Sequence, residues 1–168
     1  MFNGFPRPVP DSGSNIEVTQ RGTTTFPTSV TTHNVTINEV NLDKDIVVVF
    51  SKPGTGSGSV NAIACELTTK TNILFNKNAA LTGTQPVSWQ IIRFNNAKSK
   101  QTGTTAVSST PVNVTINPVN LEKVLLFISF TTTSTGFDYI NANFTSPTNL
   151  QLTSYSNTSV KWQIVELR

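Results

Sequence analysis

The chain reads Val35-Thr36-Ile37-Asn38-Glu39-Val40-Asn41-Leu42-Asp43-Lys44 in its first half and Val114-Thr115-Ile116-Asn117-Pro118-Val119-Asn120-Leu121-Glu122-Lys123 in its second. Three further matches flank this pair in the same order: residues 20–24 with 101–105, 71–73 with 148–150, and 87–92 with 160–165. Collinear self-similarity of this kind indicates one duplication of a large unit rather than a short solenoid repeat.

The duplication predicts four segments. An extended arm containing proline and phenylalanine spans residues 1–19, and a first β module spans 20–94. A polar linker is expected at 95–100, and the second module, a duplicate of the first, spans 101–168.

Each copy has the pattern of a strand-rich module. Charged residues make up only 12% of the chain, and β-branched threonine suits a pleated surface better than glutamate or lysine. Short alternating or apolar runs separated by turn residues predict antiparallel strands. We therefore expect an all-β fold: two tandem copies of a small antiparallel β-sandwich-like module. The expected strands are 32–37, 46–50, 60–67, 72–75 and 87–94 in the first copy, and 112–116, 124–130, 139–144, 149–155 and 160–167 in the second.

The apolar runs and the two tryptophans predict where the cores lie. Runs 46–50 and 124–130 are nearly continuous, as expected of strands covered on both faces. In the closing strands, Trp89 and Trp162 share a face with aliphatic neighbours two residues away, which predicts a core position. A module of about 70 residues buries only about 60% of its extended surface, so the modules should pack together or the chain should oligomerise.

Candidate catalytic and metal-binding residues are few. His33 is the only histidine and Cys65 the only cysteine, and their counterparts in the second copy are Val112 and Ala142. We expect His33 to be an ordinary strand or turn residue and Cys65 a core residue, because neither has the partners of a nucleophile or metal site. Asp43 and Asp45 are expected in a solvated turn. No catalytic, cofactor or metal site is predicted.

Charge and hydropathy argue against two classes of partner. The net charge is +3 with no basic run, which disfavours nucleic-acid binding. The apolar runs are far too short to cross a bilayer, so no membrane insertion is expected. The first residues lack a signal-peptide pattern, which predicts synthesis in the cytoplasm.

The arm is a candidate docking segment. Phe2 and Phe5 alternate with prolines at Pro6, Pro8 and Pro10, and alternate prolines favour an extended, polyproline-like chain. Exposed phenylalanines on such a segment would dock on a neighbouring subunit or partner. The alternative is a disordered tail.

The second copy carries a candidate ligand or interface surface. The residues are Phe137, Tyr139, Asn141, Asn143 and Tyr155. Exposed aromatic rings with nearby amides would suit a carbohydrate- or host-surface-binding module, and burial of Phe137 and Tyr139 would count against it. A larger core in this copy is the other interpretation of its extra aromatic residues.

Polar residues that recur in both copies admit two interpretations. Asn38 and Asn41 return as Asn117 and Asn120. Asparagine commonly supplies turn geometry and backbone capping, which is the interpretation we favour. The alternative is a ligand-binding edge.

The repeated motifs Gln-x-Gly-Thr, Val-Thr-Ile-Asn-x-Val-Asn-Leu-x-Lys and Val-x-Trp-Gln-Ile-(Ile/Val) resemble a repeat of structural proteins in tailed bacteriophages and prophages. In those proteins it occurs in tail-tip, fibre-associated and virion-surface modules. The resemblance covers residues 20–168 and implies a homo-oligomeric virion component that contacts other virion proteins. It implies a non-enzymatic structural or adaptor role and carries over no catalytic residue.

Overall fold

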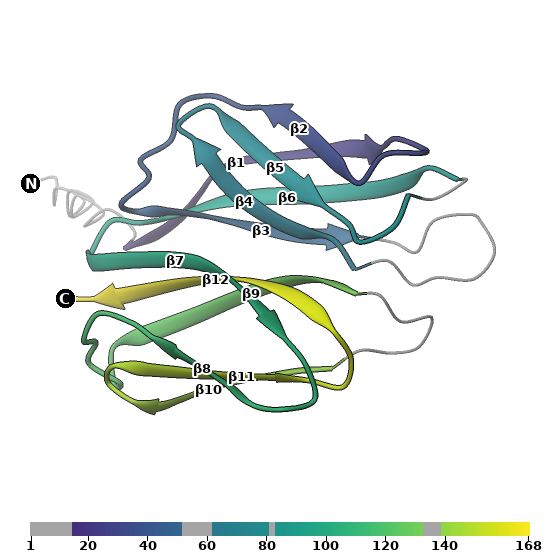
Figure 1. The fold of residues 1–168 in the computed structure, drawn as a ribbon. Helices are drawn as coiled ribbons and strands as arrows, with labels where there is room; N and C mark the ends of the chain where they lie inside the picture. Colours follow the sequence, from purple (N-terminus) through teal and green to yellow (C-terminus); the bar gives the residue numbers. More distant parts are fainter. Residues whose placement is uncertain (1–14, 52–61, 81–82, 133–138) are drawn as a thin grey trace, which may run out of the picture.

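The computed structural model describes residues 15–51, 62–80, 83–132 and 139–168, and these form an all-β structure (Figure 1). Module 1 contains β1 (Ile16–Phe26), β2 (Thr32–Thr36), β3 (Asp45–Ser51), β4 (Ala64–Thr69), β5 (Asn72–Asn76) and β6 (Gln85–Phe94). Module 2 contains β7 (Ala97–Val107), β8 (Val112–Thr115), β9 (Val124–Thr132), β10 (Ile140–Ser146), β11 (Asn149–Ser154) and β12 (Thr158–Leu167).

Each module is a sandwich of two three-stranded antiparallel sheets. The sheet orders are β1-β6-β3 and β2-β5-β4 in module 1, and β7-β12-β9 and β8-β11-β10 in module 2. Corresponding strands occupy corresponding places, so the two modules share one topology. The all-β, sandwich-like prediction is confirmed.

Each module has a first strand that the sequence pattern did not predict. β1 starts at Ile16, so residues 16–19 belong to a sheet rather than to the arm. β7 starts at Ala97, and only a turn at Asn95 and Asn96 separates it from β6. The segment expected as a polar linker is therefore mostly strand. β1 and β7 lie at sheet edges with one side open, so they carry polar and glycine residues that hide their strand character.

The recurring Gln-x-Gly motif holds each sandwich together. The Gln20 side chain donates to the carbonyl of Asn38 and accepts from its amide, both at 3.0 Å. Gln101 makes the same two bonds to Asn117 in module 2. Each glutamine thus satisfies the backbone of a loop that follows a strand of the opposite sheet. The side chains of Asn41 and Asn120 accept from the amides of Asp43 and Glu122, which is the backbone capping expected of the repeated asparagines.

Glycine recurs in the motif because a tryptophan lies on it. Gly22 pairs directly with Trp89 in the neighbouring strand, and Gly103 pairs with Trp162. A Cβ at Gly103 would lie 2.2 Å from Cζ2 of Trp162, and one at Gly22 would lie 2.5 Å from Cζ2 of Trp89. These distances are far inside carbon–carbon contact, so only glycine leaves room for the indole.

A buried carboxylate caps the same loop in each module, but from different strands. In module 1, Asp45 at the start of β3 accepts from the amide of Asn41 and forms a bidentate pair with Arg93 at 2.7 Å. In module 2, Glu166 near the end of β12 accepts from the amide of Asn120 at 3.0 Å. Asp45 on β3 corresponds to Val124 on β9, and Arg93 on β6 corresponds to Glu166 on β12.

The central strands are covered on both sides only in part. In β3, Val47 packs into the module 1 core while Ile46 packs into a separate apolar cluster. The second cluster lies between the modules and includes Phe94, Phe127 and Val165. β9 is less covered than its apolar run predicted, because Leu125 and Ile128 are each 36% exposed.

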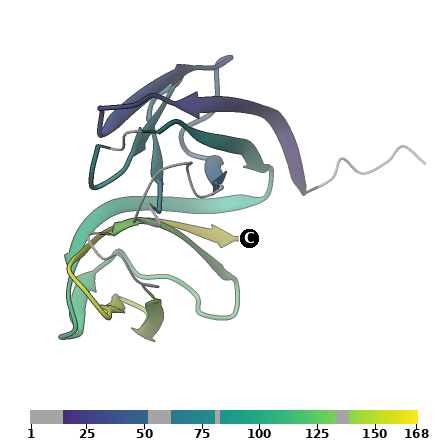
Figure 2. The same cartoon turned by 90° about the vertical axis from the view of Figure 1, so that its right-hand side faces the viewer.

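The two modules pack together with β3 and β4 of module 1 against the β7-β12-β9 sheet of module 2. Figure 1 shows β3 and β4 on the side of module 1 nearest the β7-β12-β9 sheet, with β8-β11-β10 on the far side of module 2, and Figure 2 shows the two modules one above the other. β4 also contacts β9 and β12. The stacking buries apolar surface that each small module would otherwise expose, as expected from their size.

Candidate functional site

His33 and Cys65 are both held by packing and hydrogen bonds within the fold. His33 lies on β2, where Nε2 is 2.9 Å from the hydroxyl of Thr24 and the ring packs against Phe26. Burial lowers the pKa of His33. Cys65 on β4 is buried, and burial raises the pKa of its thiol to about 12. A thiol with such a pKa is protonated near neutrality and is a poor nucleophile.

The two acids expected in a solvated turn differ in environment. Asp43 is exposed, and its backbone amide donates to the side chain of Asn41. The expectation is wrong for Asp45, which is 0% exposed. Its burial is compensated by Arg93, whose pKa is raised chiefly by their hydrogen bond. A carboxylate in this bidentate pair has a structural role.

Neither a metal site nor a membrane-spanning helix occurs in the described part of the chain. No group of three or more His, Cys, Asp and Glu side chains there is placed to hold a metal ion. The same residues include no helix with the length and apolar character needed to span a membrane.

A polar seam joins the modules, and its centre is Gln163. Its side chain donates to the carbonyl of Val47 at 2.8 Å and accepts from the Val47 amide at 3.1 Å. Val47 is on β3, the edge strand of its sheet, so the glutamine caps backbone groups that no neighbouring strand pairs. Ser129 adds a second link by bonding to the amide and carbonyl of Cys65 at 3.0 and 3.3 Å.

Two lysines complete the seam. Lys161 pairs with Glu66 across the modules. The Lys100 ammonium donates to the carbonyls of Leu42 and Asp45. Burial lowers the pKa of Lys100 to about 8, although Asp45 and Asp43 oppose the shift. Both cations thus bond across the boundary between the modules.

A cleft of about 290 Å³ opens along this seam. Its lining includes the two lysines, the carboxylates of Asp43 and Glu66, and the side chain of Gln163. Lys161, Lys100 and Gln163 are already bonded across the cleft. The arrangement is suited to holding the modules in one orientation.

The predicted docking arm lies outside the described residues, as does Phe137. β1 begins directly after the arm, with Ile16 and Val18 exposed at 47% and 42%. Ile16 and Val18 form what we call the β1 apolar edge. In module 2, the counterpart of Ile16 is Ala97, which is buried in the cluster between the modules.

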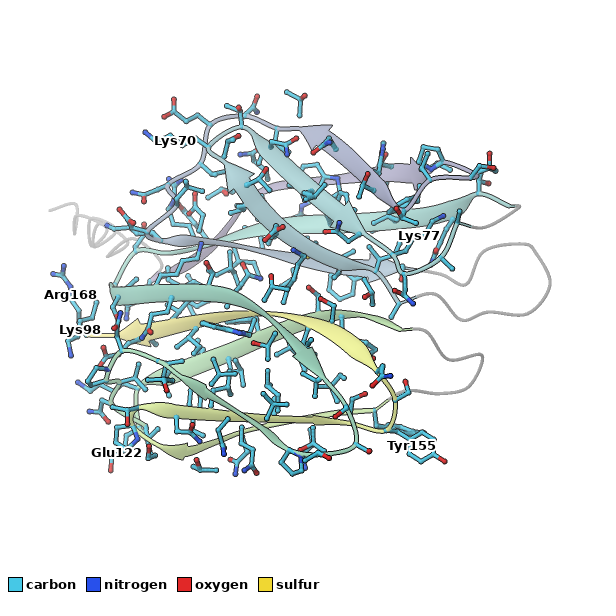
Figure 3. The ribbon with its side chains drawn as sticks, viewed as in Figure 1. Lys70, Lys77, Lys98, Glu122, Tyr155 and Arg168 are labelled. Carbon is cyan, nitrogen blue, oxygen red and sulfur yellow. The ribbon has the colours of Figure 1, made fainter. Side chains whose placement is uncertain are left out.

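The remaining surface candidates lie together on module 2. Asn141 and Asn143 on β10, and Tyr139 directly before it, alternate with the core residues Ile140, Ala142 and Phe144, so all three face outward. Tyr155 follows β11 and projects from the end of module 2 (Figure 3). Tyr139 and Tyr155 flank the last register pair of the two strands, Ile140 with Ser154, so they sit at the same end of the sheet.

Gln151 and Thr153 on β11 complete this surface, and sequence reasoning missed them. Thr153 pairs with Asn141, and Gln151 pairs with Asn143. Alternation within residues 149–155 placed these side chains outward, but their neighbours depend on register, which the sequence alone did not provide. We call the resulting surface the tyrosine–amide face, composed of Tyr139, Asn141, Asn143, Gln151, Thr153 and Tyr155.

Comparison with protein families, with curated proteins and with solved structures gave no match to this chain.

Proposed function

We propose that this chain is a non-enzymatic structural or adaptor component of a bacteriophage particle, on the tail or the virion surface. It acts through protein–protein assembly, both as a homo-oligomer and with other virion proteins. The phage assignment is based on the resemblance of the repeated motifs. The observation that carries the assembly role is the β1 apolar edge.

The duplication supports this use of the β1 apolar edge. Ala97 occupies the Ile16 position in module 2, and there it packs against Phe94 and Val165 between the modules. The same place on module 1 carries a larger apolar side chain that is about half exposed. Contiguous exposed apolar groups at a strand edge favour a partner, and the adjacent arm residues Phe2 and Phe5 would extend the contact.

The chemistry of the described residues also favours assembly. The buried or half-buried ionisable groups Asp45, Glu166, Lys100 and Lys161 all bond to other parts of the chain. They hold loops and modules in place. A body of fixed shape reduces the entropy lost when it joins a larger assembly.

The solution mass tests the assembly role. We expect the full chain to form a defined oligomer in light scattering, and expect removal of residues 2–14 or the double variant Ile16→Ser/Val18→Ser to reduce it. Val30→Ser is the matched control, because Val30 is also exposed, at 38%, but lies beyond β1. A full chain that stays monomeric at all concentrations contradicts the homo-oligomer.

The virion assignment needs a separate measurement. Mass spectrometry of purified particles from a phage that encodes this chain should detect it in fixed ratio to other structural proteins. Its absence from such particles would overturn the assignment and leave the assembly role to be judged on the solution mass.

A further inference from the structure

The two tyrosines of the chain are both exposed on one small surface. Tyr139 is 75% and Tyr155 82% exposed, the highest values among the large apolar and aromatic side chains that the structure describes as exposed. Neither ring packs against another aromatic ring or a cation among the described residues. Tyrosine offers a flat apolar face and a polar hydroxyl, so two exposed rings at one sheet end provide a surface for a ligand with both characters.

The tyrosine–amide face carries no charge. β8, β10 and β11 contain no Lys, Arg, Asp, Glu or His, although the chain has 12 basic and 9 acidic residues. An anionic ligand would find no cation on these strands, and a cationic one no carboxylate. The chemistry therefore favours a neutral ligand rich in hydroxyl groups.

The amides are arranged to meet such a ligand. Gln151 donates to the Asn113 side-chain carbonyl at 3.2 Å, and Asn149 donates to the same oxygen at 3.1 Å, which orients this part of the face. Asn141 and Asn143 have no hydrogen-bond partner for their side chains among the described residues. Each of these two amides offers two donors and an acceptor, a set that adjacent hydroxyl groups match.

The dimensions suit more than one sugar ring. Outward residues on a strand are about 6.7 Å apart, so Tyr139, Asn141 and Asn143 extend over about 13 Å. The neighbouring strand, about 4.8 Å away, adds Gln151, Thr153 and Tyr155 alongside. A short oligosaccharide laid along β10 would contact a tyrosine and at least two amides.

Module 1 lacks both tyrosines of this surface and the two outward asparagines of β10. By register, its counterparts of Tyr139 and Tyr155 are Ala62 and Asn78, and the counterpart of Asn143 is Glu66. Glu66 is engaged with Lys161 of module 2. The duplicate therefore uses this sheet for module packing, whereas module 2 leaves the same sheet open and places both tyrosines on it.

We propose that the tyrosine–amide face is a binding site for a neutral oligosaccharide. The tyrosine rings pack against the C–H face of a sugar, and Asn141, Asn143 and Gln151 bond to its hydroxyl groups. This goes beyond the assembly role and does not depend on it, since the β1 apolar edge is on the other module.

The full chain applied to an array of neutral, sialylated and sulfated glycans tests the proposal. We expect binding to a subset of neutral glycans only. Tyr139→Ala and Tyr155→Ala should each weaken binding to those glycans about tenfold or more, and Asn143→Asp should also weaken it. Asn78→Ala, at the module 1 counterpart of Tyr155, is the matched control and should bind normally.

Two further measurements distinguish loss of the binding surface from loss of the fold. Thermal midpoints should be unchanged in all four variants, because the residues are exposed. In NMR spectra, the side-chain NH2 signals of Asn141 and Asn143 should shift on adding a neutral glycan that binds. No binding to any neutral glycan, binding confined to anionic glycans, or binding that survives loss of both tyrosines would overturn the proposal. Ile16→Ser/Val18→Ser should leave glycan binding intact even if assembly is lost.

Discussion

Replacing Gly103 by alanine tests the packing of tryptophan over glycine in module 2. The new Cβ would lie 2.2 Å from Cζ2 and 2.6 Å from Cε2 of Trp162, whereas carbon atoms pack at about 3.5–4.0 Å. The indole would have to move by more than 1 Å within a core that includes Val160 and Ile164. The movement would also disturb the 3.1 Å bond from Nε1 to the Thr105 hydroxyl.

The expected cost follows from these two changes. Overpacking a core costs about 1–3 kcal/mol, and loss of the indole bond adds about 0.5–1.5 kcal/mol. We expect Gly103→Ala to lower the free energy of unfolding by about 2–4 kcal/mol. For a chain of this size, that corresponds to a fall in Tm of about 5–15 °C.

A double-mutant cycle separates the steric clash with Trp162 from any other destabilising effect of alanine at position 103. Trp162→Leu alone should destabilise by about 2–4 kcal/mol through lost packing. In that background the Cβ has room, and Gly103→Ala should be neutral or stabilising by up to about 1 kcal/mol. The coupling energy should therefore be at least about 2 kcal/mol.

Urea unfolding followed by far-UV circular dichroism provides the four free energies. Gly22→Ala is the internal comparison. Its closest contact is 2.5 Å rather than 2.2 Å, and Nε1 of Trp89 has no partner to lose among the described residues. Gly22→Ala should thus cost less than Gly103→Ala. If Gly103→Ala costs the same with tryptophan or leucine at position 162, the steric explanation is wrong.

Two further predictions concern the seam. Gln163→Met should destabilise by about 2–4 kcal/mol: the Val47 amide is left unpaired at about 1–3 kcal/mol, and the Val47 carbonyl loses a bond of about 0.5–1.5 kcal/mol and keeps only the Cys65 thiol at 3.7 Å. Gln90→Met, at the matching position of module 1, should change stability by less than about 1 kcal/mol in the same denaturation assay. Lys100 has its pKa lowered to about 8 in the folded state, so the unfolded chain binds more protons than the folded one between pH 8 and 10.5. The free energy of unfolding should therefore rise with pH across that window, by up to about 3 kcal/mol. Lys100→Met should abolish this rise, and an unchanged slope in that variant would assign the rise to another group.

The duplication and the strand content were predictable because their signals are local. The repeated motifs and the apolar runs mark β3, β6, β9 and β12 without knowledge of the fold. β1 and β7 were missed although they are the longest strands, at 11 residues each. Threonine, serine and glycine dominate them, and their strand character depends on pairing with β6 and β12.

Long-range partners explain the other differences. Asp45 looked like a turn residue, since the arginine that compensates its burial follows 48 residues later. Gln90 and Gln163 looked equivalent in the repeat, but Gln163 alone lies against the edge of β3. The tyrosine–amide face was predicted in part: Tyr139, Asn141, Asn143 and Tyr155 were named, while Gln151 and Thr153 required the register.

The buried carboxylate that caps the loop comes from β3 in module 1 and from β12 in module 2, and this difference has a consequence for how the chain folds. Two similar modules in one chain risk exchanging strands as they fold. If β3 paired with β12 in the native register, Asp45 would face Glu166; if β9 paired with β6, Arg93 would face Val124. One hybrid sheet would bring two buried carboxylates together, and the other would leave the half-buried Arg93 without its carboxylate. Both cost more than the correct pairing, so the relocated charge protects the tandem copies from misassembly with each other.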